Sequence, residues 1–119
     1  MINIFLDDER SPEDVTWVKL PEVDWHIVRT ALDFKDLITK QGVQNINYIS
    51  FDHDINDWSG PNNNKEVTGY DLLKWLCYEA VVIDLLPKCM FHTQNPIGRK
   101  NMESYYINYL NFVDDKNQI

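Results

Sequence analysis

The sequence predicts an α/β domain in which a mainly parallel sheet of about four strands is covered on both faces. Short apolar runs, typical of buried strands, alternate with longer segments of helical periodicity, which is the pattern of strand–helix–strand units. No internal repeat or low-complexity tract interrupts this alternation. The 119 residues suit one domain, so residues 1–119 are interpreted as a single unit.

The first half of the chain supplies three expected strands and one expected helix. Three short apolar runs are expected to form the strands: Ile2–Leu6, Trp25–Arg29 and Ile46–Phe51. The segment Glu9–Asp24 holds two prolines and has weak periodicity, which favours a loop with at most one helical turn. Thr30 can cap a helix over Ala31–Gln41, and Gly42 can end it.

The second half supplies a long polar loop, two helices and a fourth strand. Asn56–Val67 is expected to form the loop, because it is polar and rich in asparagine. Thr68 and Asp71 have the spacing of a capping box and predict the start of a helix. Lys88–His92 is the fourth expected strand, and Pro96 fits the first position of the last helix. That helix has an apolar side with the spacing i, i+3, i+4, i+7: Met102, Tyr105, Tyr106, Tyr109, Leu110 and Val113.

The chain is acidic, with a net charge of −8. This charge repels phosphate backbones and anionic membrane surfaces, so a general coating of nucleic acid and membrane binding are not expected. No apolar stretch approaches the ~20 residues of a membrane helix, and a cytoplasmic protein is expected. Cys77 and Cys89 lack a metal-binding spacing and are expected to be reduced, buried thiols. The sequence does not indicate an oligomeric state.

Acidic residues follow two of the expected strands. Asp7 and Asp8 come after the first strand, and Asp52 and Asp54 come after the third. Because ligands bind at the carboxyl ends of the strands in such sheets, we expect the four carboxylates to converge at one edge. Carboxylates in close contact need a cation, so all four are expected to bind Mg²⁺ or another divalent cation. The alternative is that Asp8 and Asp54 only cap local turns.

Two histidines are expected at the same edge of the sheet. His53 lies between two of the aspartates, and His92 ends the fourth strand. Neighbouring carboxylates orient an imidazole and favour its protonated form. Together with Asp52, the two histidines are therefore interpreted as catalytic groups for acid/base chemistry on a phosphoester. The alternative for each histidine is an ordinary hydrogen-bonded strand terminus.

The start of the last helix is a candidate phosphate site. Asn95, Gly98 and Arg99 combine a helix N-terminus with a guanidinium, and both groups bind phosphate oxygens. The alternative is an ordinary capped helix with a surface arginine. Gly69 and Tyr70, after the polar loop, are expected to line the other wall of the pocket.

Four motifs lie in order along nearly the whole chain: Leu6-Asp7-Asp8-Glu9-Arg10, Phe51-Asp52-His53-Asp54, Thr68-Gly69-Tyr70-Asp71 and His92-Thr93-Gln94-Asn95-Pro96-Ile97-Gly98-Arg99-Lys100-Asn101-Met102. Their combination resembles the cyclic-phosphate processing receiver domains, a divergent branch of the response-regulator receiver fold. The resemblance implies a small receiver-like, flavodoxin-like three-layer sandwich. It also implies a phosphorylated small molecule or an RNA end as partner.

By this resemblance, Asp7, Asp8 and Asp52 correspond to the Mg²⁺ ligands of receivers, and Asp52 also corresponds to the phosphoacceptor. Thr93, or His92 one residue earlier, corresponds to the hydroxyl residue after the fourth strand. The chain departs from receivers in two places: a proline-bearing segment replaces the first helix, and no fifth strand with its lysine follows the last helix. Arg99 is the candidate to replace the charge of that lysine.

Three functions are therefore compared. The first is an enzyme that processes cyclic phosphates of nucleotides or RNA ends with a divalent metal. The second is a signalling receiver that accepts phosphate on Asp52. The third is a non-catalytic acidic binding or inhibitor protein, for which Trp17, Trp25 and Trp58 would form the contact surface.

Overall fold

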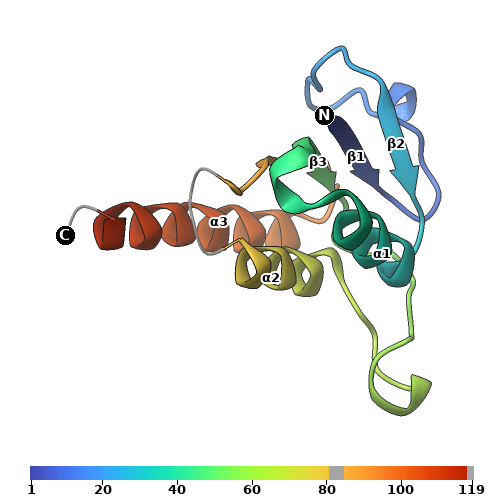
Figure 1. Cartoon of the computed structure of the whole chain (residues 1–119). Coiled ribbons are helices and arrows are strands. Elements are labelled where there is room, and N and C mark those ends of the chain that lie inside the picture. Colours follow the sequence, from blue (N-terminus) through green and yellow to red (C-terminus); the bar gives the residue numbers. More distant parts are fainter. Residues whose placement is uncertain (81–84, 118–119) are drawn as a thin grey trace.

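Four parallel strands form one sheet in the order β2-β1-β3-β4 (Figure 1). The computed structural model describes residues 1–80 and 85–117. The strands have these bounds: β1 Ile2–Leu6, β2 Trp25–Val28, β3 Ile46–Phe51 and β4 Lys88–Phe91. They confirm the expected strands, with Arg29 and His92 lying one residue beyond strand ends. The described residues form no fifth strand.

Three helices begin where the sequence places them. Their bounds are α1 Ala31–Gln41, α2 Gly69–Glu79 and α3 Pro96–Asn117. Thr30 Oγ1 accepts a hydrogen bond from the Asp33 N–H, and Thr68 and Asp71 form a reciprocal capping box. Gly42, with φ of +86°, follows the last turn of α1 and adopts a backbone conformation that L side chains disfavour. Local capping chemistry therefore sets these boundaries.

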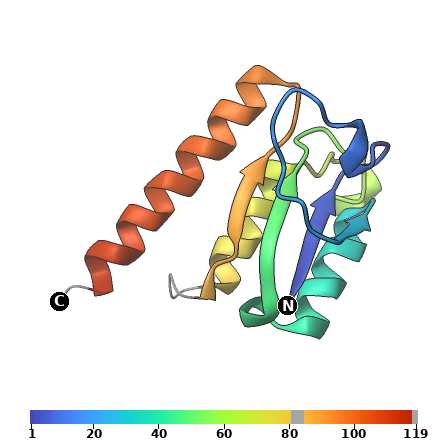
Figure 2. The ribbon, with the colours of Figure 1, turned by 90° about the horizontal axis from the view of Figure 1, so that it is seen from above.

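One face of the sheet packs against the helices. Alternate side chains of paired strands point to this face, because Ile4 pairs with Ile49 and Leu6 with Phe51 in the parallel register. α1 and α2 cover the face, and α3 packs beside α2 against β4 (Figure 2). The buried core joins strand and helix residues: Ile4, Leu6, Ile49, Phe51, Phe34, Ile38, Leu72, Leu73, Leu76 and Met102.

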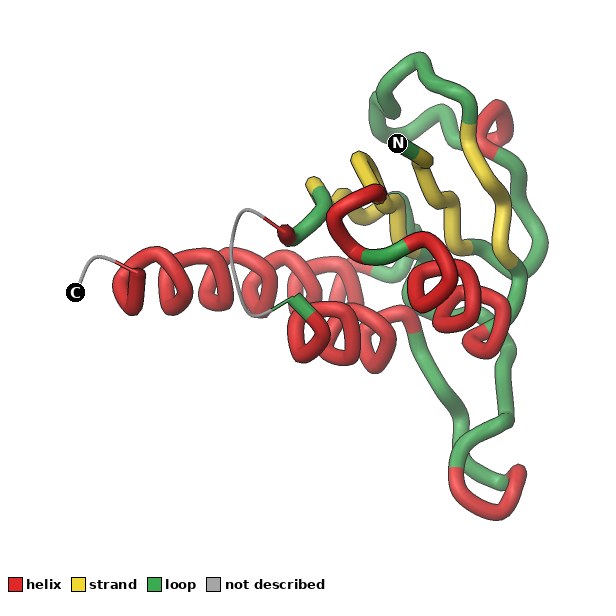
Figure 3. The backbone as a smooth tube through the Cα atoms, in the orientation of Figure 1, coloured by secondary structure: helices red, strands yellow, loops and turns green. Residues whose placement is uncertain are grey.

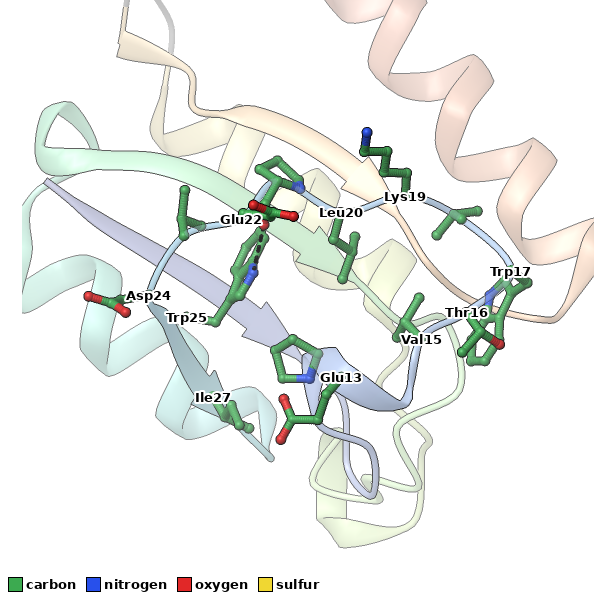
Figure 4. A pocket seen from close by; sticks show the side chains of 14 residues that line it. Glu13, Val15, Thr16, Trp17, Lys19, Leu20, Glu22, Asp24, Trp25 and Ile27 are labelled. Atoms are coloured by element: carbon green, nitrogen blue, oxygen red, sulfur yellow. Dashed lines mark hydrogen bonds between the residues drawn. The ribbon is translucent and has the colours of Figure 1, made fainter.

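The opposite face is covered by the chain between β1 and β2 (Figure 4). This segment is a loop with one short 3₁₀ turn at Pro12–Asp14, as the proline content predicts. Trp17 reaches across the sheet, and its indole N–H donates to the His92 carbonyl at 2.7 Å. Trp25 donates to the Pro21 carbonyl, and its ring packs edge-on against Phe5. The third layer of the sandwich is therefore a loop instead of helices.

The polar loop Asn56–Val67 projects from the body of the domain (Figure 3). It closes through an antiparallel bridge between Asp57 and Val67, and the Gly60 N–H donates to the Lys65 carbonyl. The loop prediction is confirmed, and the loop has a defined backbone pairing at its base.

Both cysteines are free thiols, as expected, although Cys89 is only partly buried. Cys77 is buried, and burial raises the pKa of its thiol to about 12, so it stays protonated at neutral pH. Every helix in the described part of the chain is too short or too polar to span a bilayer.

Candidate functional site

A cavity of about 260 Å³ lies at the carboxyl edge of the sheet. The segments that follow β1, β3 and β4 line it with nine residues: Asp7, Asp8, Glu9, Arg10, Asp52, Asp54, Thr93, Gln94 and Asn95. β1 and β3 are neighbours in the sheet, and the chain leaves them toward opposite sides. The cavity therefore occupies the switch point in strand order, where ligands bind in open parallel sheets.

The sheet itself fixes the first residue after each of these strands. The Asp7 N–H donates to the Val28 carbonyl, the Asp52 N–H to the Leu6 carbonyl, and the His92 N–H to the Phe51 carbonyl. The ladder thus extends one residue beyond the strands and presents the acidic side chains from a rigid backbone. Of the ten residues expected as catalytic, phosphate-binding or metal-binding groups, six line the cavity: Asp7, Asp8, Asp52, Asp54, Thr93 and Asn95.

Asp7 is a buried carboxylate that the protein holds through both oxygens. Oδ1 accepts hydrogen bonds from the backbone N–H groups of Glu9 and Arg10, at 2.9 and 2.8 Å. Oδ2 lies 3.0 Å from His92 Nε2. Burial alone would raise the pKa of Asp7, but the bonds from His92, Arg10 and Glu9 outweigh it and lower the pKa to about 2. Asp7 is therefore ionised at neutral pH.

The pKa of Asp52 is shifted in the opposite direction from that of Asp7. Its side chain is only 5% exposed, and Oδ1 accepts the His53 N–H at 2.9 Å. Burial and the neighbouring negative charge of Asp7 raise the pKa of Asp52, although a hydrogen bond with Thr93 and the ring of His92 act in the other direction. The protein alone therefore leaves the charge of this carboxylate incompletely balanced.

These groups fit a hard divalent cation. Carboxylate oxygens of Asp7 and Asp52 and a ring nitrogen of His92 lie within 4.8 Å of one another. His92 Nε2 is hydrogen-bonded to Asp7, so the ligand atoms that remain for a metal are carboxylate oxygens. Mg²⁺ prefers oxygen ligands. Asp8 and Asp54 add two carboxylates to the same cavity. The oxygen donors and the charge of Asp52 favour Mg²⁺ binding, which remains a prediction.

His92 is completely buried and does not line the cavity. Its Nδ1 lies 2.7 Å from Ser50 Oγ and its Nε2 3.0 Å from Asp7 Oδ2, so both ring nitrogens have partners. The ring also stacks on Phe5, with centroids 4.3 Å apart. The sequence led us to expect proton exchange between His92 and a substrate, and this role stays a prediction. The contacts of the ring favour an alternative role, in which His92 positions the Asp7 carboxylate.

His53 does not line the cavity but contacts Asp54, which does. His53 Nδ1 lies 2.9 Å from Asp54 Oδ1, and the Asn95 side-chain amide donates to Asp54 Oδ2 at 3.0 Å. Burial acts to raise the pKa of Asp54, but these two partners lower it overall. The imidazole lies against Gly98, where an added Cβ would sit 2.5 Å from His53 Cγ. Gly98 therefore makes room for the ring of His53.

Of the residues expected to bind phosphate at the start of α3, Asn95 lines the cavity, whereas Gly98 and Arg99 have partners elsewhere. The Gly98 N–H already donates to Asn95 Oδ1 at 3.0 Å, as in an ordinary helix cap. Arg99 Nε donates to Glu103 Oε1 at 2.7 Å, and neither Gly98 nor Arg99 lines the cavity. The pairing i, i+4 of Arg99 with Glu103 was visible in the sequence and favours the surface-arginine alternative.

Arg10 is the cationic side chain that lines the cavity. One guanidinium nitrogen lies 3.8 Å from Asp7 Oδ2, and another donates to Gln94 Oε1 at 3.1 Å. The guanidinium lies over the ring of Trp17, 5.2 Å from its centroid. Arg29 holds the same turn by donating to the carbonyls of Asp7 and Arg10. The sequence-based site omitted Arg10, although its position three residues after Asp7 was the available signal.

Gly69 contacts the backbone that follows β3, behind the site. The Gly69 N–H donates to the His53 carbonyl at 2.7 Å, and an added Cβ would overlap the Asp52 carbonyl oxygen. Neither Gly69 nor Tyr70 lines the cavity, in contrast to the expected second wall. The close approach of α2 to β3 is possible because residue 69 is glycine.

Comparison with known proteins assigns a family to this arrangement. The family model described as cyclic-phosphate processing Receiver domain matches residues 2–108, which is most of the chain. Neither a curated protein nor a solved structure gives a match.

Proposed function

The chain belongs to the cyclic-phosphate processing receiver family, and from that premise we propose that its acidic cavity binds and hydrolyses a cyclic phosphate of a nucleotide or an RNA end. The observation that carries the proposal is one cavity with two unlike features. Asp52 has a charge that its neighbours leave incompletely balanced, and Arg10 presents a guanidinium beside it. A cation and a phosphate together would satisfy both groups.

Each side chain has a proposed role. Asp7, Asp8 and Asp52 would hold the divalent cation, which when bound stabilises negative charge on phosphate oxygens. Arg10 binds a phosphate oxygen, and Gln94 orients the guanidinium through the bond at 3.1 Å. These groups come from three separate strand ends, which the sheet places in a fixed relation.

Hydrolysis of the ring adds a water oxygen to phosphorus and breaks one phosphorus–oxygen ester bond. The attacking water must lose a proton, and the departing ribose oxygen must receive one. Asp54 lines the cavity and is hydrogen-bonded to His53 Nδ1. In this proposal the pair accepts the proton of the attacking water and returns it to the departing ribose oxygen. Asp54, also expected as a metal ligand, would then act from the edge of the site.

The test is the hydrolysis of a panel of 2′,3′-cyclic nucleotides in the presence of Mg²⁺. Asp52→Asn removes the charge but keeps the shape of the side chain, and we expect it to lower kcat/KM at least about 100-fold. Asp36→Asn, on the exposed side of α1, is the matched control and should leave the rate unchanged. Hydrolysis that persists in Asp52→Asn would contradict the proposal.

A second candidate function is phosphate acceptance by Asp52. It is favoured by the hydrogen bond between Asp52 and Thr93, the pair that the receiver resemblance relates to the phosphoacceptor and its hydroxyl partner. Incubation with a small phosphodonor and Mg²⁺, followed by intact-mass measurement, separates the two functions. A stable mass increase that is lost in Asp52→Asn would favour signalling over turnover.

The third candidate, a binding protein with a tryptophan contact surface, has less support. The indole N–H groups of Trp17 and Trp25 are bonded to backbone carbonyls, and both rings are partly buried. Trp58 is the most exposed of the three tryptophans proposed for that surface, at 55%. It lies in a different part of the molecule, on the projecting loop.

A further inference from the structure

A second cavity adjoins the acidic cavity on the side of α1 and the projecting loop. Asp8 and Glu9 line both cavities, so the two lie next to each other at the turn after β1. The acidic cavity, at about 260 Å³, suits a phosphate group with its cation and not a complete nucleotide. The second cavity, at about 770 Å³, provides the room that the rest of a nucleotide requires.

Two exposed apolar side chains line this second cavity. Trp58, on the loop, is 55% exposed, and Leu32, on α1, is 65% exposed. They come from elements that are distant in sequence, and they lie beside a strongly polar site. An exposed indole face next to a phosphate site is the surface on which proteins stack a nucleobase.

The tryptophan is held in place before any ligand binds. Its indole N–H donates to Asn56 Oδ1 at 3.2 Å. The adjacent Asp57 anchors the loop: its Oδ2 accepts the Ala31 N–H at the start of α1, and its carbonyl accepts the Val67 N–H. Because the indole N–H is already hydrogen-bonded, the face of the ring is the part left for a nucleobase to stack on. The fixed position of the ring lowers the entropy cost of that stacking.

We propose that this second cavity binds the nucleobase of a nucleoside cyclic phosphate, stacked on Trp58 beside Leu32, while the phosphate occupies the acidic cavity. The inference rests on the proposed function and adds to it the site that binds the base of the nucleotide or of the terminal nucleoside of an RNA. Asn63 also lines the cavity, and an asparagine amide has the donors and the acceptor to hydrogen-bond the edge of a base.

The experiment compares adenosine 2′,3′-cyclic phosphate with glycerol 1,2-cyclic phosphate, which has the cyclic phosphate but no base. Trp58→Ala should raise KM for the nucleotide about 5- to 150-fold, the range expected for loss of one stacked base. It should leave kcat, and both constants for the base-free substrate, unchanged. Trp58→Phe should restore most of the affinity. Tyr78→Ala removes an aromatic ring that is 80% exposed and lines a different cavity, and it serves as the control.

Each outcome decides a separate point. An unchanged KM for the nucleotide in Trp58→Ala, or an equal loss for both substrates, would overturn the nucleobase site. If the wild-type protein hydrolyses the base-free substrate and binds the nucleotide no more tightly, the inference fails and the proposed function stands. If it hydrolyses neither, the proposed function fails. An equilibrium titration with adenosine 2′-monophosphate and Mg²⁺ then tests the base site, and equal binding by wild type and Trp58→Ala overturns it.

Discussion

The acidic cavity and the start of α3 both have the composition of a phosphate site, and they differ in how far the protein satisfies its own groups. At the start of α3, Asn95 caps the helix and Glu103 binds Arg99. In the cavity, Arg10 and Asp52 keep charge that their neighbours balance only in part. Polar composition alone therefore does not identify a binding site. Binding requires groups whose internal partners are incomplete, and this difference can be tested.

The largest expected effect comes from His92, which stabilises the cavity from behind. In His92→Ala, the buried Asp7 carboxylate loses its partner at 3.0 Å, and we expect the free energy of unfolding to fall by about 3–5 kcal/mol. Urea denaturation followed by circular dichroism measures this change. His26→Ala, at an exposed position of β2, should change it by less than about 0.5 kcal/mol. Equal small effects for the two histidines would contradict the positioning role.

A smaller effect is the pH dependence that Asp7 gives to stability. The pKa of Asp7 is about 2 in the folded protein, below its ordinary value of 3.8. A depressed carboxyl pKa stabilises the fold above the unfolded pKa, and this contribution, about 2 kcal/mol, is lost as the pH falls from about 4 to 2. Urea midpoints across this range should therefore decrease more steeply for wild type than for Asp7→Asn. A constant difference between the two proteins would refute the assignment.

The smallest effect compares the two arginines directly. Arg10→Gln should weaken binding of inorganic phosphate in the presence of Mg²⁺ about tenfold, because a charge-assisted hydrogen bond is lost. Arg99→Gln should leave this affinity within about twofold, since Arg99 is paired with Glu103 outside the cavity. Isothermal titration calorimetry measures both. A larger loss in Arg99→Gln than in Arg10→Gln would restore the start of α3 as the phosphate site.

The two histidines show why part of the site could not be predicted. His53 and His92 both follow strands, and the sequence treats them alike. In the structure His53 is partly exposed and paired with its neighbour Asp54, whereas His92 is buried between Ser50 and Asp7, which are 42 and 85 residues away. The strand order and the course of the loop after β1 bring these distant partners to His92. No local pattern in the sequence indicates the strand order or the course of the loop.

The sequence by itself determined the elements, the parallel sheet and the convergence of the acidic strand ends. Apolar periodicity and capping residues are local properties, and parallel strands bring their carboxyl ends to one edge. The tertiary structure decided which polar groups at that edge remain available to a ligand. It buried the ring of His92 against Phe5, placed the ring of His53 against Gly98, and brought Arg10 into the cavity. Availability depends on hydrogen bonds and packing between distant segments, and only the folded chain brings those segments together.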